Sequence, residues 1–215
     1  MANPDRRDPW LDIPLSDYEG HMSADSVAQL SVLGSLFAEV LAECRPESVA
    51  ILGVAGGNGL EHVDPLVTRR VVGVDLNRSY LEAVRRRHGV RLHLELHRLD
   101  LATEKLELEP VHLVHAALIF EHAGTDRCLE NAIALVAPDG ALSVVLQLPG
   151  SAPDVAATPF LSIQTLARNF SIIDPGAFTS LLETRGFRLR AQTTRPLPGG
   201  KAFWMGIFRR TSDRF

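Results

Sequence analysis

Residues 49–59 read Val-Ala-Ile-Leu-Gly-Val-Ala-Gly-Gly-Asn-Gly, an apolar run of strand length that leads directly into a glycine-rich turn. A second apolar run, Val71 to Val74, ends on Asp75. Glycines let backbone N–H groups approach a ligand closely at the N-terminus of a helix. A carboxylate at the tip of the adjacent strand can accept hydrogen bonds from both hydroxyls of a ribose. The stretch therefore predicts an α/β arrangement that binds a nucleoside.

The spacing of the glycines restricts which nucleoside this turn binds. A dinucleotide fingerprint needs G-x-G-x-x-G, but the register from Gly57 gives Gly57, Gly59 and then His62. A P-loop needs Gly-Lys-Ser/Thr, and residues 58–60 read Asn-Gly-Leu. The spacing therefore disfavours both a nicotinamide dinucleotide and a nucleoside triphosphate.

Apolar strand patterns alternate with helical patterns along most of the chain, which is typical of a doubly wound α/β sheet. The expected strands are 48–54, 70–75, 90–96, 111–116 and 141–148. The expected helices run from a cap at Ser23 to Pro46, from the glycine turn to Asp64-Pro65, from Asn77 to His88, from Asp126 to Val136, and from Pro175 to Arg185. Two further strands, 187–195 and 201–210, predict a C-terminal hairpin.

The pair Gly57-x-Gly59, with Asp75 downstream and the terminal hairpin, resembles the class I S-adenosylmethionine (SAM)-dependent methyltransferases over roughly residues 24–210. The resemblance implies a Rossmann-like, mostly parallel seven-stranded sheet whose last strand is antiparallel. It also implies SAM as the cofactor.

The first motif of that family usually reads acidic-x-G-x-G-x-G, and this chain departs from it twice. Gly53 stands at the acidic position, and Ala55 stands at the first glycine, followed by Gly57 and Gly59. Alanine is tolerated at position 55 if its φ is negative. In the family the missing carboxylate holds the methionine ammonium, so the resemblance leaves that role to backbone carbonyls near Ala116 and to the Tyr18-Glu19 segment.

Two further acidic residues match positions that contact the nucleoside in the family. Asp75, followed by Leu76, matches the ribose-binding position, and Asp100, followed by Leu101, matches the position beside the adenine amino group. Each aspartate also has a structural interpretation. Asp75 could cap the next helix, although Asn77 already fits that role, and Asp100 could form a turn.

The fourth predicted strand is followed by Glu121-His122, which resembles the Glu-His pair of many small-molecule methyltransferases. A histidine of near-neutral pKa suits the deprotonation of a hydroxyl or amine, so His122 and Glu121 are the catalytic candidates. The alternative is a histidine that fixes the loop or packs beside the cofactor. His93, Glu95 and His97 share one face of a strand, but polar alternation explains them, and no metal site is expected.

The chain is expected to form a single domain, residues 1–215, with two segments added to the sheet. Residues 1–22 read as irregular and are expected to form a lid over the cofactor, with Tyr18, His21 and Met22 nearest the first helix. Residues 149–173 exceed normal loop lengths and contain the apolar stretch 160–163. This insertion is expected over the methyl donor, as the wall for an apolar acceptor or as the contact of a homodimer.

Composition bounds the function classes. The net charge of −4 gives no basic footprint for nucleic acid, and the apolar runs fall short of a membrane span. A charged N-terminus without a signal peptide, together with only two cysteines, predicts a cytoplasmic location. The sequence thus predicts methyl transfer from SAM to a small molecule, with the acceptor atom left open. The alternatives are a protein that binds SAM without transferring its methyl group and a nicotinamide-dependent reductase.

Overall fold

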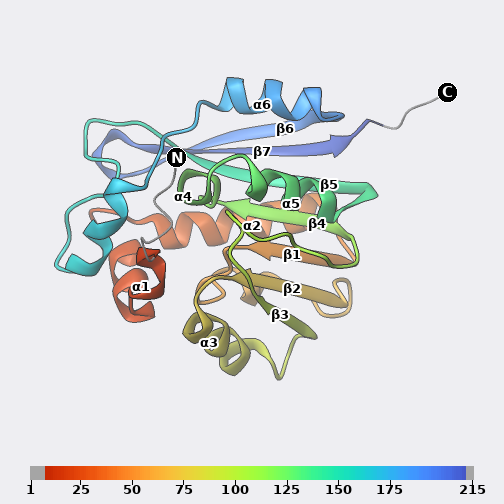
Figure 1. The fold of residues 1–215 in the computed structure, drawn as a ribbon, viewed down its shortest axis with the longest axis horizontal. Coiled ribbons are helices and arrows are strands. Elements are labelled where there is room, and N and C mark those ends of the chain that lie inside the picture. Colours follow the sequence, from red (N-terminus) through yellow and green to blue (C-terminus); the bar gives the residue numbers. More distant parts are fainter. Residues whose placement is uncertain (1–7, 212–215) are drawn as a thin grey trace.

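The computed structural model describes residues 8–211, and their core is a seven-stranded sheet in the order β3-β2-β1-β4-β5-β7-β6 (Figure 1). The strands are β1 Ser48–Leu52, β2 Arg70–Asp75, β3 Leu94–Arg98, β4 Val111–Ala117, β5 Val136–Leu148, β6 Phe187–Pro196 and β7 Ala202–Arg210. The first five strands pair in parallel, and β7 pairs antiparallel with both β5 and β6. The predicted sheet and its C-terminal hairpin are confirmed.

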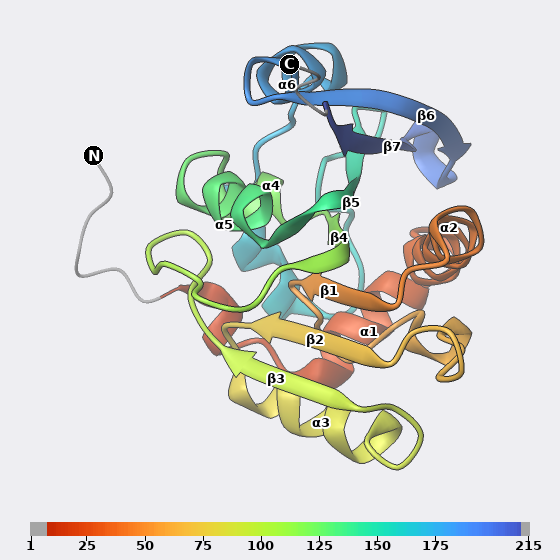
Figure 2. The ribbon, with the colours of Figure 1, turned by 90° about the vertical axis from the view of Figure 1, so that its right-hand side faces the viewer.

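Helices pack on both faces of the sheet (Figure 2). The helices α2, Gln29–Cys44, and α3, Arg78–His88, share one apolar core, and α5, Arg127–Leu135, and α6, Pro175–Thr184, share the other. Successive residues of β1 alternate between these cores, so that Val49 faces the first and Ala50 the second. Predicted caps are also confirmed, since Asn77 accepts the N–H of Ser79 and Asp174 that of Ala177.

Several predicted boundaries are wrong. No α-helix follows the glycine turn, because Asp64-Pro65 comes so soon that only one 3-10 turn, Leu60–His62, forms. Ser23 ends a helix instead of capping one, and α2 begins later, at Gln29. The third strand begins at Leu94 instead of Val90, and the fifth begins at Val136 instead of Ala141.

The segment before α2 forms helical structure, so the expectation that residues 1–22 are irregular is wrong for the part that the structure describes. Residues 1–7 lie outside that part. A 3-10 turn, η1, covers Pro9–Leu11, and α1 covers Leu15–Ser23. Three residues of α3 and its cap hold this segment. Asn77 Nδ2 donates to the Trp10 carbonyl over 2.9 Å, the Tyr80 hydroxyl donates to the Ile13 carbonyl over 3.0 Å, and Arg87 forms an ion pair with Glu19.

Residues 149–173 lie against α1 at the same end of the sheet (Figure 1) and include the 3-10 stretch η3, Leu161–Arg168. Ser162 Oγ donates to Asp17 Oδ2 over 2.7 Å, and His21 Nδ1 lies 2.9 Å from Thr158 Oγ1. The Phe160 ring fills the space that a side chain at Gly20 would take. We call η1, α1 and residues 149–173 together the roof.

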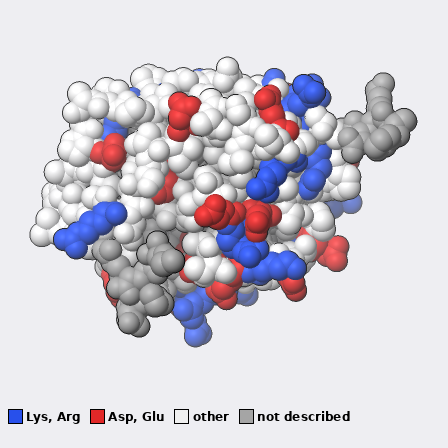
Figure 3. Space-filling model, turned by 45° about the horizontal axis from the view of Figure 1, so that its top comes forward, with Lys and Arg blue, Asp and Glu red and all other residues white. Residues whose placement is uncertain are grey.

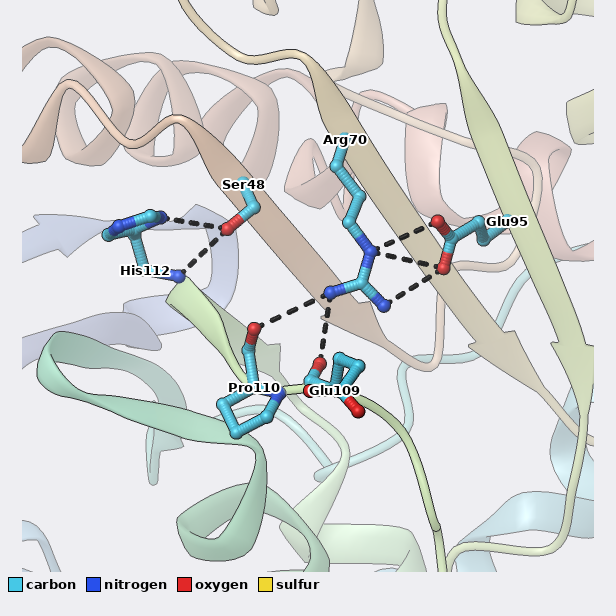
Figure 4. Close-up of polar contacts among 6 residues, drawn as sticks. All are labelled: Ser48, Arg70, Glu95, Glu109, Pro110 and His112. Atoms are coloured by element: carbon cyan, nitrogen blue, oxygen red, sulfur yellow. Dashed lines mark hydrogen bonds and ion pairs between the residues drawn. The ribbon is translucent and has the colours of Figure 1, made fainter.

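Polar contacts hold the strands together at the opposite end of the sheet (Figure 4). Arg70 pairs with Glu95 across β2 and β3 over 2.9 Å and donates to the carbonyl of Glu109. Ser48 Oγ lies 2.9 Å from His112 Nδ1 and accepts the His112 backbone N–H. These contacts join β1 to β4 and hold the amino ends of the strands together.

Charges of both signs are interspersed on the face in Figure 3, and the left part, toward the roof, carries few of them. Among residues 8–211, no helix combines the length and apolar character that crossing a membrane requires.

Candidate active site

A cavity lies between the carboxyl ends of the parallel strands and the roof, where ligands bind in open α/β sheets. Its sheet side is formed by the residues that follow β1, β2, β3 and β4, and by Gln147 near the end of β5. The sheet-side residues used below are Gly53, Ala55, Asp75, Leu76, Asp100, Leu101, Ala117, Leu118, Ile119, His122 and Gln147. Those from the roof, from α2 and from the turn between α1 and α2 are Trp10, Tyr18, His21, Met22, Val27, Gln29, Asp154, Val155, Ile163, Leu166 and Phe170.

Asp75 ends β2 and presents a fixed carboxylate to this cavity. Its Oδ2 accepts the N–H of Ala55 and its Oδ1 accepts the N–H of Asn77, each over 2.8 Å. Burial raises the Asp75 pKa to about 6, although these backbone hydrogen bonds lower it. A carboxylate has about four acceptor positions, so each oxygen keeps one for a ligand. The geometry therefore suits a donor pair such as two ribose hydroxyls.

Within the glycine turn, only the first half faces the cavity. Gly53 lines it with φ +70, and a Cβ there would lie 3.0 Å from Ile119 Cδ1. Ala55 also lines it, but its φ is +45, so the expected negative φ is wrong. The hydrogen bond to Asp75 holds Ala55 in this conformation, which favours glycine.

Gly57 and Gly59, by contrast, are not among the cavity-lining residues. Both have positive φ, and a Cβ at Gly59 would lie 2.8 Å from Phe37 Cδ1 in α2. A Cβ at Gly57 would lie 3.1 Å from the His88 ring at the end of α3. These two glycines allow the turn to pack closely against α2 and α3. They therefore fix the position of the turn without lining the cavity.

Asp100 lies at the cavity with Leu76 and Leu101, as the sequence predicted. It also forms the turn that was its alternative interpretation, since Oδ1 accepts the N–H of Ala102 and Oδ2 accepts the Thr103 hydroxyl. The two interpretations are compatible, because the turn fixes the carboxylate beside two leucines.

At the end of β4, Ala116 is fully buried inside the sheet and does not line the cavity. The chain continues through Ala117 and Leu118, which do line it. Leu118 has φ +55 and donates its N–H to the Val145 carbonyl over 3.0 Å. The backbone that meets a ligand here is thus one to two residues beyond the predicted position.

Glu121 and His122 are the two central residues of the short helix α4, Phe120–Ala123, and their side chains diverge. Glu121 is 1% exposed and does not line the cavity; its Oε1 accepts the N–H of Gln147 over 2.8 Å, and its Oε2 has no partner among the described residues. Burial raises the pKa of Glu121 to about 7, against the hydrogen bond from Gln147. Because the carboxyl faces away from the ligand space, its position supports a structural role.

His122 faces the cavity between two aromatic rings. The centroid of its ring lies 5.0 Å from that of Trp10 and 5.1 Å from that of Phe170, both edge-on. Burial lowers the pKa of His122 to about 4, so the ring is neutral at physiological pH. The expected near-neutral pKa is therefore wrong, and an imidazole with so low a pKa is a weak base. The two edge-on ring contacts fit the alternative interpretation, a histidine that packs beside a ligand.

The roof contributes Tyr18 to the cavity, as the sequence predicted. It also contributes the aromatic residues Trp10 and Phe170, which were not predicted there. Tyr18 packs edge-on against Trp10 with centroids 5.7 Å apart. Burial raises the pKa of Tyr18, with Asp75 and Glu19 adding to the effect, so its hydroxyl stays protonated near Asp75. Glu19 instead pairs with Arg87 and is not among the lining residues.

Sequence reasoning missed Trp10, Gln29, Gln147 and Phe170. Trp10 and Phe170 lie in segments without a periodic pattern. The signal that could have identified them as cavity residues is an aromatic side chain in a polar or loop-like segment. Gln147 is a polar residue inside an apolar strand, which is an observable signal for a buried, paired side chain. No group of His, Cys, Asp and Glu within residues 8–211 has the arrangement of a metal site.

No protein-family model and no curated protein matches this chain by sequence. Solved structures do match its fold. The N-methyltransferase NodS from Bradyrhizobium japonicum WM9, solved with S-adenosyl-L-homocysteine (SAH), is 16% identical with a TM-score of 0.60 over 97% of this chain and 94% of that one.

Two further structures agree with this match. Magnesium protoporphyrin IX methyltransferase (ChlM) from Synechocystis PCC 6803, with bound SAH, is 12% identical with a TM-score of 0.67, over 91% of this chain and 94% of that one. A SAM-dependent methyltransferase from Mesorhizobium loti is 18% identical with a TM-score of 0.61, over 80% and 96%. The chain therefore has the Rossmann-like fold of the class I SAM-dependent methyltransferases.

Proposed function

We propose that the protein binds SAM and transfers its methyl group to a small-molecule acceptor. The observation that carries this proposal is the Asp75 carboxylate, fixed by two backbone N–H groups at the end of β2 and open to the cavity. Leu76, Asp100 and Leu101 lie at the same corner and suit an adenine ring with its amino group.

Bound SAM would supply a methyl group on a sulfonium centre, for in-line displacement by the acceptor. Alignment of the reactants in a dry pocket supplies much of the acceleration of such a reaction. The roof covers one side of the cavity and includes Tyr18, and Ala117 and Leu118 line the cavity at the β4 end. His122 lines the cavity beside Trp10 and Phe170 and would pack against the acceptor.

Isothermal titration calorimetry of the whole protein with SAH and, separately, with NAD tests the binding step. The proposal predicts SAH binding at micromolar affinity or better and no NAD binding. Binding of NAD without any binding of SAH would contradict it and would favour a reductase.

A second candidate is a protein that binds SAM without transferring its methyl group. Gly53 favours it, because the carboxylate that holds the methionine ammonium in the family is absent there. Methyl-labelled SAM incubated with the protein and a small-metabolite extract distinguishes the two. Enzyme-dependent appearance of label in a product supports transfer, and SAH binding without labelled product supports the second candidate.

A further inference from the structure

Two glutamine side chains, Gln29 and Gln147, form a buried amide pair at the wall of the cavity. Gln29 is the first residue of α2 and is 6% exposed, Gln147 near the end of β5 is 2% exposed, and both line the cavity. Gln147 Nε2 donates to the Asp154 carbonyl over 2.9 Å, and Gln29 Nε2 donates to Gln147 Oε1 over 2.8 Å. The pair is therefore a chain of hydrogen bonds that begins at a backbone carbonyl and ends at Gln29.

The backbone carbonyl fixes the orientation of both amides. Because a carbonyl oxygen only accepts, Gln147 must present its NH2 group to Asp154 and its oxygen to Gln29. Gln29 must then donate from its own NH2 group, which leaves its Oε1 as the free end of the chain. Gln29 Oε1 accepts no hydrogen bond within residues 8–211, and it is not among the fully enclosed atoms that lack a partner. It is therefore an acceptor open to the cavity, and the same amide keeps a second N–H.

The surroundings of this amide suit an uncharged ligand group. Among the described residues, no lysine or arginine lines the cavity. Lys201 does not line it either, and the Asp154 carboxylate offsets the charge of this lysine. His21 does line it, with Nδ1 2.9 Å from Thr158 Oγ1, but burial and then the charge of Lys201 lower the pKa of His21, so the imidazole is neutral. A charged group beside Gln29 would lose its water without gaining an opposite charge.

The position of the amide pair separates it from the proposed ribose site. β5 lies three strand spacings from β2, roughly 14 Å across the sheet, so Gln147 and Asp75 line separate parts of the cavity. The roof contributes apolar side chains to the same cavity, among them Val155, Ile163 and Leu166. The pair is thus a polar group in a largely apolar wall, where it can orient a ligand whose body is apolar.

We propose that the methyl acceptor joins an apolar body to a carboxamide, an uncharged group with both a donor and an acceptor, and that Gln29 binds this group. The carboxamide N–H would donate to Gln29 Oε1, and its oxygen can accept the free N–H of Gln29. The nitrogen lone pair of an amide is delocalised, so this group anchors the molecule and a different atom receives the methyl group. The word acceptor rests on the proposed methyl transfer, whereas the amide site itself does not.

The first test observes the glutamine side chains directly by NMR. Protein labelled with 15N at the glutamine side-chain amides gives signals from the four glutamines of the chain, and Gln164 and Gln192, which do not line the cavity, are the internal controls. The probes are benzamide, benzoate, benzylamine and N,N-dimethylbenzamide, which lacks the N–H donor. The expected result is a saturable shift of the Gln29 signal with benzamide, and binding of the other three that is weaker by about tenfold. Equal binding of benzamide and any of the other probes, or no shift of Gln29, would overturn the proposal.

The second test uses variants. Gln29→Met keeps the length of the side chain but removes its oxygen and N–H groups, so benzamide binding should weaken by about tenfold. Gln147→Met removes only the anchor of Gln29 and should weaken it less. The matched control is Gln164→Met, since Gln164 donates to a roof carbonyl outside the cavity lining, and its affinity should equal that of the wild type. Circular dichroism checks that each variant is folded, and equal affinity of Gln29→Met and the wild type would contradict the proposal.

The cofactor provides the last comparison. Benzamide should still shift Gln29 in the presence of saturating SAH. Competition from SAH, but not from 5′-methylthioadenosine, which lacks the amino acid arm, would assign Gln29 to the cofactor and overturn the proposal. Failure of the wild type to bind SAH, with the benzamide shift at Gln29 intact, would instead reject methyl transfer and leave the amide site standing.

Discussion

The backbone N–H of Ala55 donates to the Asp75 carboxylate over 2.8 Å, which joins the turn after β1 to the tip of β2. This bond fixes the carboxylate at the cavity and holds Ala55 at a positive φ. One contact thus sets both the proposed ribose site and the local strain beside it. The first three predictions follow from it.

Asp75→Ala should weaken SAH binding by roughly 30–150-fold, because about 2–3 kcal/mol is lost when ribose hydroxyls have no acceptor. The N–H groups of Ala55 and Asn77 also lose their acceptor, so some loss of stability accompanies it. Calorimetry on the folded variant measures the effect. Asp64→Ala is the matched control, since Asp64 caps the N–H of Leu66 in an exposed turn. Wild-type affinity in folded Asp75→Ala would remove this residue from the site.

SAH affinity should depend on pH through Asp75, whose pKa burial raises to about 6. Ribose hydroxyls stabilise the ionised carboxylate, so binding lowers this pKa and releases a proton. Affinity should therefore be highest above pH 6 and fall by about tenfold between pH 7.5 and pH 5. Calorimetry in two buffers of different ionisation enthalpy should detect the released proton. In Asp75→Asn the pH dependence should vanish, and its persistence would assign the proton to another group.

Ala55→Gly should stabilise the protein by about 0.5–1 kcal/mol, because relief of the positive φ outweighs the added entropy of the unfolded chain. Urea unfolding gives the difference in the free energy of unfolding. The control is Ala24→Gly, where φ is −58 and the same substitution should destabilise. A loss of stability at both positions would show that Ala55 is not strained.

Glu121→Gln should become more stable relative to the wild type as pH rises. Burial raises the Glu121 pKa to about 7, so the wild type loses stability between the ordinary carboxyl pKa, about 4.5, and pH 7. Glutamine keeps an acceptor for the Gln147 N–H and does not titrate. Urea unfolding at pH 5 and pH 8 should show a relative gain of about 2 kcal/mol for the variant.

Glu95→Gln provides the control for this titration, because the hydrogen bond from Arg70 lowers the Glu95 pKa. Its effect on stability should be nearly the same at pH 5 and pH 8. A relative change for Glu121→Gln no larger than that of this control would show that the Glu121 carboxyl ionises normally.

Tyr18→Phe should weaken SAH binding several-fold and leave adenosine binding nearly unchanged, if the Tyr18 hydroxyl contacts the methionine end. The Trp10 packing survives because the ring is retained. Competition calorimetry with both ligands measures the ratio. Equal losses for SAH and adenosine would place Tyr18 at the nucleoside end instead.

Most of the sheet could be predicted from the sequence, because buried strands and capped helices leave local signals. Asn77 and Asp174 mark helix starts by the side-chain oxygens that accept the first free N–H groups. Asp75 was identifiable because it terminates an apolar run. The absence of a helix after Gly59 could also have been predicted, because only residues 60–63 lie between Gly59 and Asp64-Pro65 and an α-helix needs more residues than that.

The roof was the least predictable part. Its two pieces are distant in sequence, and η1, α1 and η3 are held by tertiary contacts such as Asn77 to Trp10 and Ser162 to Asp17. Short helices depend on such packing more than on propensity. The positions of Gly57 and Gly59 also depend on tertiary contacts. They were predicted as ligand contacts, whereas in the structure they allow the turn to pack closely against α2 and α3.

The meeting of Gly20 and Phe160 has a consequence for how molecules pass in and out. The Phe160 ring occupies the place of a side chain at position 20, so one added methyl group would wedge α1 away from residues 149–173. On the proposed function, we expect that separation of these two segments would widen the way out for a ligand beneath them. The contacts of Asp17 with Ser162 and of His21 with Thr158 join the same two segments, so their loss should speed ligand release more than it changes the binding contacts at the sheet.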